Sequence, residues 1–113
     1  MFNLFKKNNF DISNISNDNV NEFLKTGDLK ITYLISPDFG GSEARDNQVV
    51  VTPKAYIEKQ IIDNELYNFL EEGKSIKNFN VDLKYKENSI VPSEIIITGN
   101  IDGNDYKKVI VVW

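Results

Sequence analysis

The last third of the chain constrains the fold most, because its apolar and polar residues alternate with the two-residue period of a β-strand. FNVDLKYK at residues 79–86 places all its apolar side chains on one face. Two further apolar segments follow at 93–101 and 106–113, and DGND at 102–105 between them is typical of a tight hairpin turn. The pattern predicts three antiparallel strands whose sheet has one solvated face.

The final segment departs from this alternation. YKKVIVVW, residues 106–113, ends in a run that is apolar on both faces. A strand at the edge of a sheet usually carries polar residues or other features that prevent further pairing. We therefore expect residues 106–113 to form a strand inside the sheet rather than at its edge.

Two helices are predicted upstream. NVNEFLKTG, residues 19–27, forms a short helix that Asp18 or Asn19 caps and that stops at Gly27. Residues 52–73 begin with a threonine cap followed by proline at the first helical position. The apolar face of this second segment consists of Ala55, Ile62, Leu66, Phe69 and Leu70, with Ile57 and Ile61 off that face. The pair Asp63-Asn64 leaves open whether the segment is one helix or two.

Two more strands are predicted between the helices. In DLKITYLIS, residues 28–36, period two places Leu29, Ile31, Tyr33 and Ile35 on one face. QVVVT, residues 48–52, is rich in β-branched residues and is expected to be the returning strand.

The resulting order is α-β-β-α-β-β-β, which predicts an α+β fold. We expect a mostly antiparallel sheet of about five strands with one main helix packed on one face. The 113 residues are expected to form a single domain, residues 1–113. Residues 1–17 either attach loosely or dock on the domain through Phe2, Leu4 and Phe5, although these residues followed by Lys6-Lys7 are also compatible with contact to a membrane or partner.

Composition excludes several chemistries. The chain contains neither cysteine nor histidine, which removes thiol and imidazole catalysis and the commonest ligands of transition metals. The net charge of −4 and the scattered lysines argue against nucleic acid as a partner. No apolar run reaches the roughly 18–20 residues that span a bilayer. The lack of disulfides favours a reducing compartment, so we expect a cytoplasmic protein, and the excess of asparagine, isoleucine and lysine is typical of AT-rich bacterial genomes.

The loop SPDFGGSEARDNQ, residues 36–48, is the best candidate for a functional site. It is longer than a hairpin requires, contains adjacent glycines and holds the only arginine of the chain. Glycine N–H groups can form an anion-binding nest, which Arg45 would close on a carboxylate or phosphate. Alternatively, Arg45 pairs with a nearby carboxylate and the loop is only a connection. The candidate binding residues are Asp38, Phe39, Gly40, Gly41, Glu43, Arg45 and Asp46.

Catalysis is not expected. Asp38-Phe39-Gly40 matches the kinase DFG triplet, but no other kinase signature accompanies it. The carboxylates of Asp38, Glu43 and Asp46 are chemically suited to Ca²⁺ or Mg²⁺, but their spacing matches no EF-hand. Glu43 with Asp38 or Asp46 is the only pair suited to glycosidase-type chemistry, and nothing in the sequence requires that role. We therefore assign no catalytic residue, no metal ligand and no cofactor.

Three functional hypotheses remain. The first and favoured one is a small acidic protein that binds another protein, such as an inhibitor or immunity protein that neutralises a basic toxin. The second is a regulatory domain that binds a small anion in the 36–48 loop. The third is a carboxylate- or metal-dependent enzyme. Self-association as a homodimer is compatible with each hypothesis.

Overall fold

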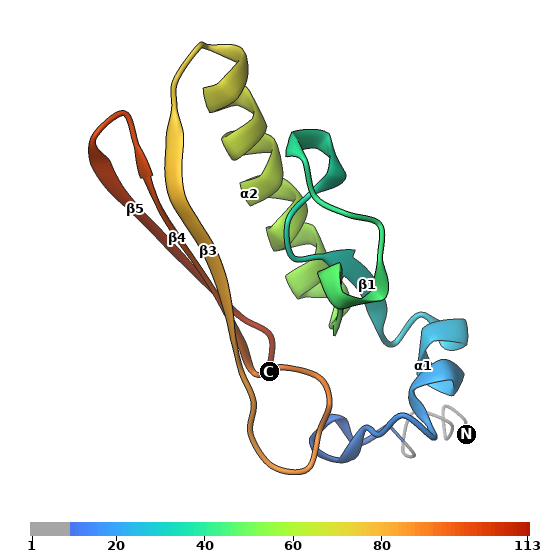
Figure 1. The fold of residues 1–113 in the computed structure, drawn as a ribbon. Coiled ribbons are helices and arrows are strands. Elements are labelled where there is room, and N and C mark those ends of the chain that lie inside the picture. The colour runs from blue at the N-terminus through green and yellow to red at the C-terminus, as the bar shows by residue number, and fades with distance from the viewer. Residues whose placement is uncertain (1–9) are drawn as a thin grey trace.

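The computed structural model describes residues 10–113 and contains two α-helices and five strands (Figure 1). This confirms the predicted α+β class and the predicted order of elements. The elements are α1 (Val20–Thr26), β1 (Lys30–Tyr33), β2 (Gln48–Val51), α2 (Pro53–Glu71), β3 (Ile76–Lys84), β4 (Glu94–Ile101) and β5 (Asn104–Val111).

The strands form two antiparallel sheets rather than the single sheet we expected. Strands β1 and β2 pair only with each other, and the other sheet has the order β3-β4-β5. A further strand cannot easily extend the β3 edge, because the register of β3 shifts between Lys77 and Asn80 and Asn78 adopts a positive φ of 55°. The β1–β2 pair instead lies across one face of the larger sheet.

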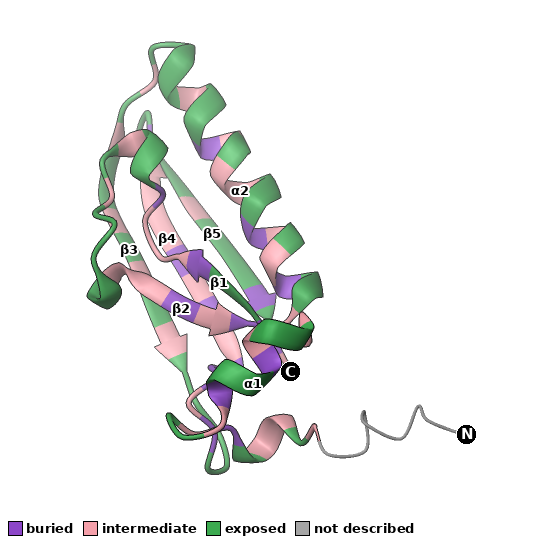
Figure 2. Ribbon diagram, turned by 90° about the vertical axis from the view of Figure 1, so that its right-hand side faces the viewer, coloured by how far each residue is buried: buried purple, intermediate pink, exposed green. Residues whose placement is uncertain are grey.

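That face, here called the inner face, is covered by two elements. Figure 2 shows α2 near β5, while the β1–β2 pair lies in front of the rest of the sheet. The core between these layers includes fully buried aliphatic residues from all of them, such as Val51, Ala55, Leu66, Ile95 and Ile97. The outer face of the sheet is polar along β3, where Asn80, Asp82 and Lys84 are exposed. One face of the sheet is therefore solvated, as the alternation predicted.

Strand β5 lies at the edge of the sheet, so the prediction that it lies inside was wrong. Strand β4 occupies the centre and pairs with both neighbours. The apolar run of β5 divides between the two faces: Ile110 and Val112 are buried, whereas Val109 and Val111 are exposed. The apolar run at the end of β5 therefore belongs to an edge strand with one exposed face, not to a strand buried within the sheet.

The β4–β5 hairpin turns at Asp102-Gly103, as predicted. Both residues have positive φ, 50° and 86°, which is the geometry of a type I′ turn. The Asp102 carboxylate also accepts a hydrogen bond of 2.8 Å from the Ser75 N–H, which ties the turn to the start of β3.

Helix α2 is continuous, which resolves the question of one helix or two. The Thr52 hydroxyl accepts a hydrogen bond from the Ala55 N–H, and Pro53 occupies the first turn, as predicted. Ile57 and Ile61 are exposed and lie off the buried face. The asparagine at position 64 is accommodated because it is exposed on the helix surface.

The predicted face of the 28–36 segment was wrong. The strand is only four residues long, and its buried side chain is Thr32, opposite Val49. Ile31 pairs with Val50 on the other face and is exposed. Leu29 precedes the strand, in the turn where its N–H donates to the Phe23 carbonyl of α1, and its side chain is buried. Its burial therefore follows from the helix-to-strand turn, not from strand alternation.

A tyrosine joins α2 to β5. The Tyr106 hydroxyl donates a hydrogen bond of 2.7 Å to the Glu65 carboxylate, and burial, followed by the Glu65 contact, raises the pKa of Tyr106. We expect Tyr106→Phe to lower the free energy of unfolding by about 1–2 kcal/mol, because a hydrogen bond to a charged group is lost. Urea unfolding measures this. The double variant Tyr106→Phe/Glu65→Gln should differ little from Tyr106→Phe, and independent, additive effects would contradict the contact.

Residues 10–17 contact the β3–β4 turn. The carbonyls of Ser13 and Ile15 accept hydrogen bonds from the Asn88 and Ile90 N–H groups, and Ile15 is buried. Phe10 packs against Phe23 of α1, with 4.9 Å between ring centroids and the two rings tilted by 55°. Phe2, Leu4, Phe5 and Lys6-Lys7 lie outside the described residues.

Candidate binding site at the loop between β1 and β2

The loop from 34 to 47 contains two 3₁₀ turns. The Ser36 hydroxyl caps the first turn, Pro37–Phe39, by accepting the Asp38 N–H at 3.1 Å. Gly40 then adopts φ 101°, a conformation that favours glycine. The second turn, Arg45–Asn47, leads directly into β2.

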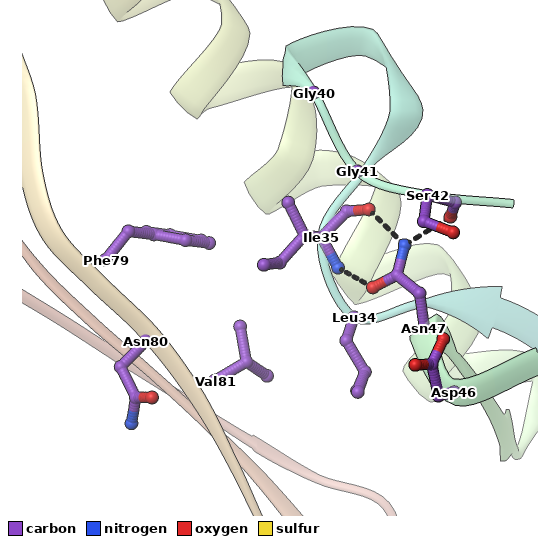
Figure 3. A pocket seen from close by; sticks show the side chains of 10 residues that line it. All are labelled: Leu34, Ile35, Gly40, Gly41, Ser42, Asp46, Asn47, Phe79, Asn80 and Val81. Carbon is purple, nitrogen blue, oxygen red and sulfur yellow. Dashed lines mark hydrogen bonds between the residues drawn. The ribbon is translucent and has the colours of Figure 1, made fainter. Parts of the chain in front are cut away.

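Asn47 holds the loop together. Its side-chain oxygen accepts the Ile35 N–H at 2.9 Å, and its amide nitrogen donates to the Ile35 carbonyl at 2.8 Å and the Ser42 carbonyl at 2.6 Å (Figure 3). One side chain thus satisfies backbone groups on both sides of the loop. We did not select Asn47 from the sequence. Its place two residues before a β-branched run was the only local signal, since asparagine readily bonds to nearby backbone.

An open groove lies between this loop and β3. A hollow of about 390 Å³ is lined by the loop and by Phe79, Asn80 and Val81 of β3. An adjoining hollow of about 210 Å³ shares Ile35 and Phe79 with it and extends to the end of α2. Figure 3 shows the side chains of Phe79 and Val81 directed toward Leu34 and Ile35 across the space. We call both hollows together the loop groove; its lining is Leu34, Ile35, Phe39, Gly40, Gly41, Ser42, Asp46, Asn47, Leu70, Ile76, Phe79, Asn80 and Val81.

The loop and β3 both contribute apolar side chains to the floor of the groove. Phe39 and Phe79 meet edge to face with 6.0 Å between ring centroids. Phe79 and Val81 are only half-buried. The alternation of β3 predicted that these side chains point inward, but their incomplete cover is a tertiary feature.

The predicted site residues divide among different places. Phe39, Gly40, Gly41 and Asp46 line the loop groove, whereas Asp38 and Glu43 do not. Asp38 instead lies near α2, where its charge contributes to raising the pKa of Asp63.

Arg45 lies on a different hollow. That hollow, of about 170 Å³, also involves Val20 and Leu24 of α1 and Ile31 of β1. The N–H groups of Gly40 and Gly41 donate to the carbonyls of Pro37 and Ser36. These donors and Arg45 therefore do not converge on one place where an anion would sit.

The carboxylates do not gather into a metal site. Between residues 10 and 113, no group of three or more acidic side chains is arranged to hold a metal ion. Of the three loop carboxylates, only Asp46 lines a described hollow. This arrangement offers no support for two-carboxylate hydrolysis, which needs both groups beside one substrate.

A buried ion pair lies on the inner side of α2. Lys59 is 0% exposed, and its ammonium group contacts the Asp63 carboxylate at 2.7 Å. Burial lowers the pKa of Lys59 and raises the pKa of Asp63, while the contact between them opposes both shifts. We did not predict this pair, although position 59 follows Ala55 by four residues and therefore shares its helix face.

No protein-family model matches the chain, and no similar sequence is found among curated proteins. Within residues 10–113, no helix is both long enough and apolar enough to cross a membrane.

Proposed function

We propose that this chain acts by binding another protein and that the loop groove is its contact surface. The observation that carries this proposal is an open groove with an apolar floor beside a loop whose acidic side chains form no ion pair with any other described residue. Protein interfaces commonly combine an apolar centre with a polar rim. The groove is shallow and open, which suits a side chain or loop of a partner.

Charge defines the kind of partner. The side chains of Asp38, Glu43 and Asp46 form no ion pair within the described part of the chain. Together with the net charge of −4, they favour a basic protein that presents an apolar side chain to the groove. Electrostatic attraction of this kind accelerates association and weakens as salt is added.

The construction of the loop favours tight binding. Asn47 ties both sides of the loop together, so the groove is organised before the partner arrives. A preorganised surface loses less conformational entropy on association. An inhibitor or immunity-type protein in the bacterial cytoplasm, which neutralises a basic toxin, fits these properties. The small-anion alternative is less favoured because the glycine N–H groups already bond within the loop.

Charge reversal at the loop tests the proposal. We expect Glu43→Lys/Asp46→Lys to weaken partner affinity by roughly ten- to a hundredfold, because like charges then face the partner. The partner is first captured at low salt with a photo-crosslinking residue at position 42, which lines the groove. Affinity is then measured by calorimetry at low and moderate salt.

The matched control reverses the same number of charges elsewhere. Glu71 and Glu87 are exposed and line none of the described hollows, so Glu71→Lys/Glu87→Lys should retain most of the affinity. Thermal unfolding establishes that both variants remain folded. Equal weakening by the two variants, or binding that salt does not affect, would contradict the proposed surface.

A further inference from the structure

Strand β5 presents a regular edge, and no other strand within residues 10–113 pairs with it on that side. The Val112 N–H donates to the Ser93 carbonyl at 2.8 Å, so the even-numbered residues of this segment direct their backbone groups toward β4. Backbone groups alternate in direction along an antiparallel ladder. The N–H and C=O groups of Lys107, Val109 and Val111 therefore point away from the sheet.

The middle of this edge has exposed side chains on both faces of the sheet, although Ile110 and Val112 on the inner face are buried. Lys107, Lys108 and Val109 are consecutive in the strand and are all exposed, although successive side chains lie on opposite faces. On the outer face, Val109 is 47% exposed and Val111 is 62% exposed. The edge thus combines unpaired backbone groups with exposed β-branched side chains, a combination that natural sheets usually avoid.

The opposite edge of the same sheet is different. Strand β3 contains the register shift between Lys77 and Asn80 and the positive φ of Asn78, which interrupt regular pairing. The β4–β5 pairing has no such irregularity from Glu94↔Val111 to Ile101↔Asn104. Only the β5 edge of this sheet is suited to the addition of another strand.

We propose that β5 pairs antiparallel with β5 of a second copy of this chain, with Val109 at the twofold axis. The two three-stranded sheets then join into one continuous sheet. A twofold arrangement uses the same strand on both subunits. It leaves only the two β3 edges free, and their irregularity stops further growth. The product is a closed dimer rather than a fibre.

The register with Val109 at the twofold axis avoids unfavourable pairs that neighbouring registers would create. A twofold axis at Lys107 or Lys108 would place each lysine directly opposite its own copy, which is unfavourable. An axis at Ile110 would pair Lys107 with Trp113, whose N–H is already directed to the Ser93 carbonyl. An axis at Val109 avoids both conflicts, because Lys107 then lies opposite Val111 of the second copy.

The outer face is complementary in this register. Ile96 lies beside Val109, and Asp82 lies beside Ile96. The twofold axis therefore creates one row of four apolar side chains with an aspartate at each end. In the adjacent row, Glu94 lies beside Val111, so Lys107 of one subunit reaches toward Glu94 of the other across that valine.

The dimer is expected to be weak. One pair of strands buries less than the roughly 800 Å² per partner of a standard interface, so we expect a dissociation constant in the micromolar range. The edge shares no residue with the loop groove. Dimerisation and partner binding are therefore separable in experiment.

Cysteine crosslinking tests the register directly, because the chain has no native cysteine. In a hydrogen-bonded antiparallel pair, Cα atoms are about 5.5 Å apart, within the range for a disulfide. We expect Val109→Cys to form a covalent dimer under mild oxidation. Val111→Cys should not, because the two copies of position 111 are four residues out of register, or about 13 Å apart. Lys107→Cys/Val111→Cys should crosslink.

A proline variant tests the same edge without crosslinking. Val109→Pro removes an N–H that makes no bond to β4, so the fold is retained. Sedimentation should show wild type passing from monomer to dimer over micromolar concentrations, and Val109→Pro remaining monomeric with a similar unfolding midpoint. A wild type that stays monomeric at millimolar concentration would overturn the proposal. So would equal crosslinking at position 109 and at the exposed control position Ile61→Cys.

Discussion

Replacement of Lys59 by alanine is expected to lower the free energy of unfolding by about 3–5 kcal/mol, a large share of the stability of a small domain. Lys59 is fully buried, and its ammonium group lies 2.7 Å from the Asp63 carboxylate. Without the lysine, a largely buried carboxylate has no opposite charge beside it. The loss of packed side-chain methylenes adds to this effect. Urea unfolding at neutral pH measures the change.

A double substitution separates the charge from the packing. Lys59→Met/Asp63→Leu removes both charges and keeps similar volume, so we expect stability near wild type or higher. The changes in unfolding free energy caused by Lys59→Met and by Asp63→Leu alone should therefore add up to much more than the change in the double variant. Lys54→Ala is the matched control, because Lys54 lies on the same helix and is exposed. If Lys59→Ala were as mild as Lys54→Ala, the ion pair would not be buried as described.

Substitution of Gly41 by alanine is expected to destabilise the protein by roughly 2–4 kcal/mol, the worth of two or three lost hydrogen bonds. A Cβ atom at position 41 would lie 1.7 Å from the Ile35 carbonyl oxygen and 2.6 Å from its carbon. Backbone atoms cannot move aside as a flexible side chain would. The turn has to open, which breaks the bond from the Gly41 N–H to Ser36 and disturbs the Asn47 contacts with Ile35.

The adjacent glycine is the matched control. A Cβ atom on Gly40 meets no atom within 4 Å, although its φ of 101° is unfavourable for alanine. We therefore expect Gly40→Ala to cost only about 1 kcal/mol. Thermal unfolding compares the two variants, and NMR shifts of the Val81 methyl groups report the state of the loop groove. Equal stability of the two variants would mean that the loop relaxes around the added methyl group.

Local sequence signals predicted the elements well. The Thr52-Pro53 start of α2, the stop of α1 at Gly27 and the Asp102-Gly103 turn all appear as expected. Each depends on backbone geometry that a few neighbouring residues determine. The same holds for the exposure of Ile57 and Ile61, which follows from helix periodicity alone.

The candidate site was predicted only in part. The sequence directed attention to the 36–48 loop, and four of the seven chosen residues line the loop groove. It did not indicate that Arg45 lies on another hollow or that Asn47 organises the loop. A loop has no periodicity, so its side-chain directions depend on turns and on the surface beneath it.

By itself, the sequence determined the type and order of the elements, the stop of α1 at Gly27, the start of α2 at Thr52-Pro53 and the hairpin turn. These features arise from interactions within a few residues. The predicted side-chain cap of α1 is absent, because Asn19 at the cap position makes no such hydrogen bond. Only the tertiary structure decided that β1 and β2 form a separate sheet, that β5 lies at an edge and that Lys59 is buried. Each of these depends on which distant segments pack together, and apolar periodicity gives the face of an element but not its neighbour.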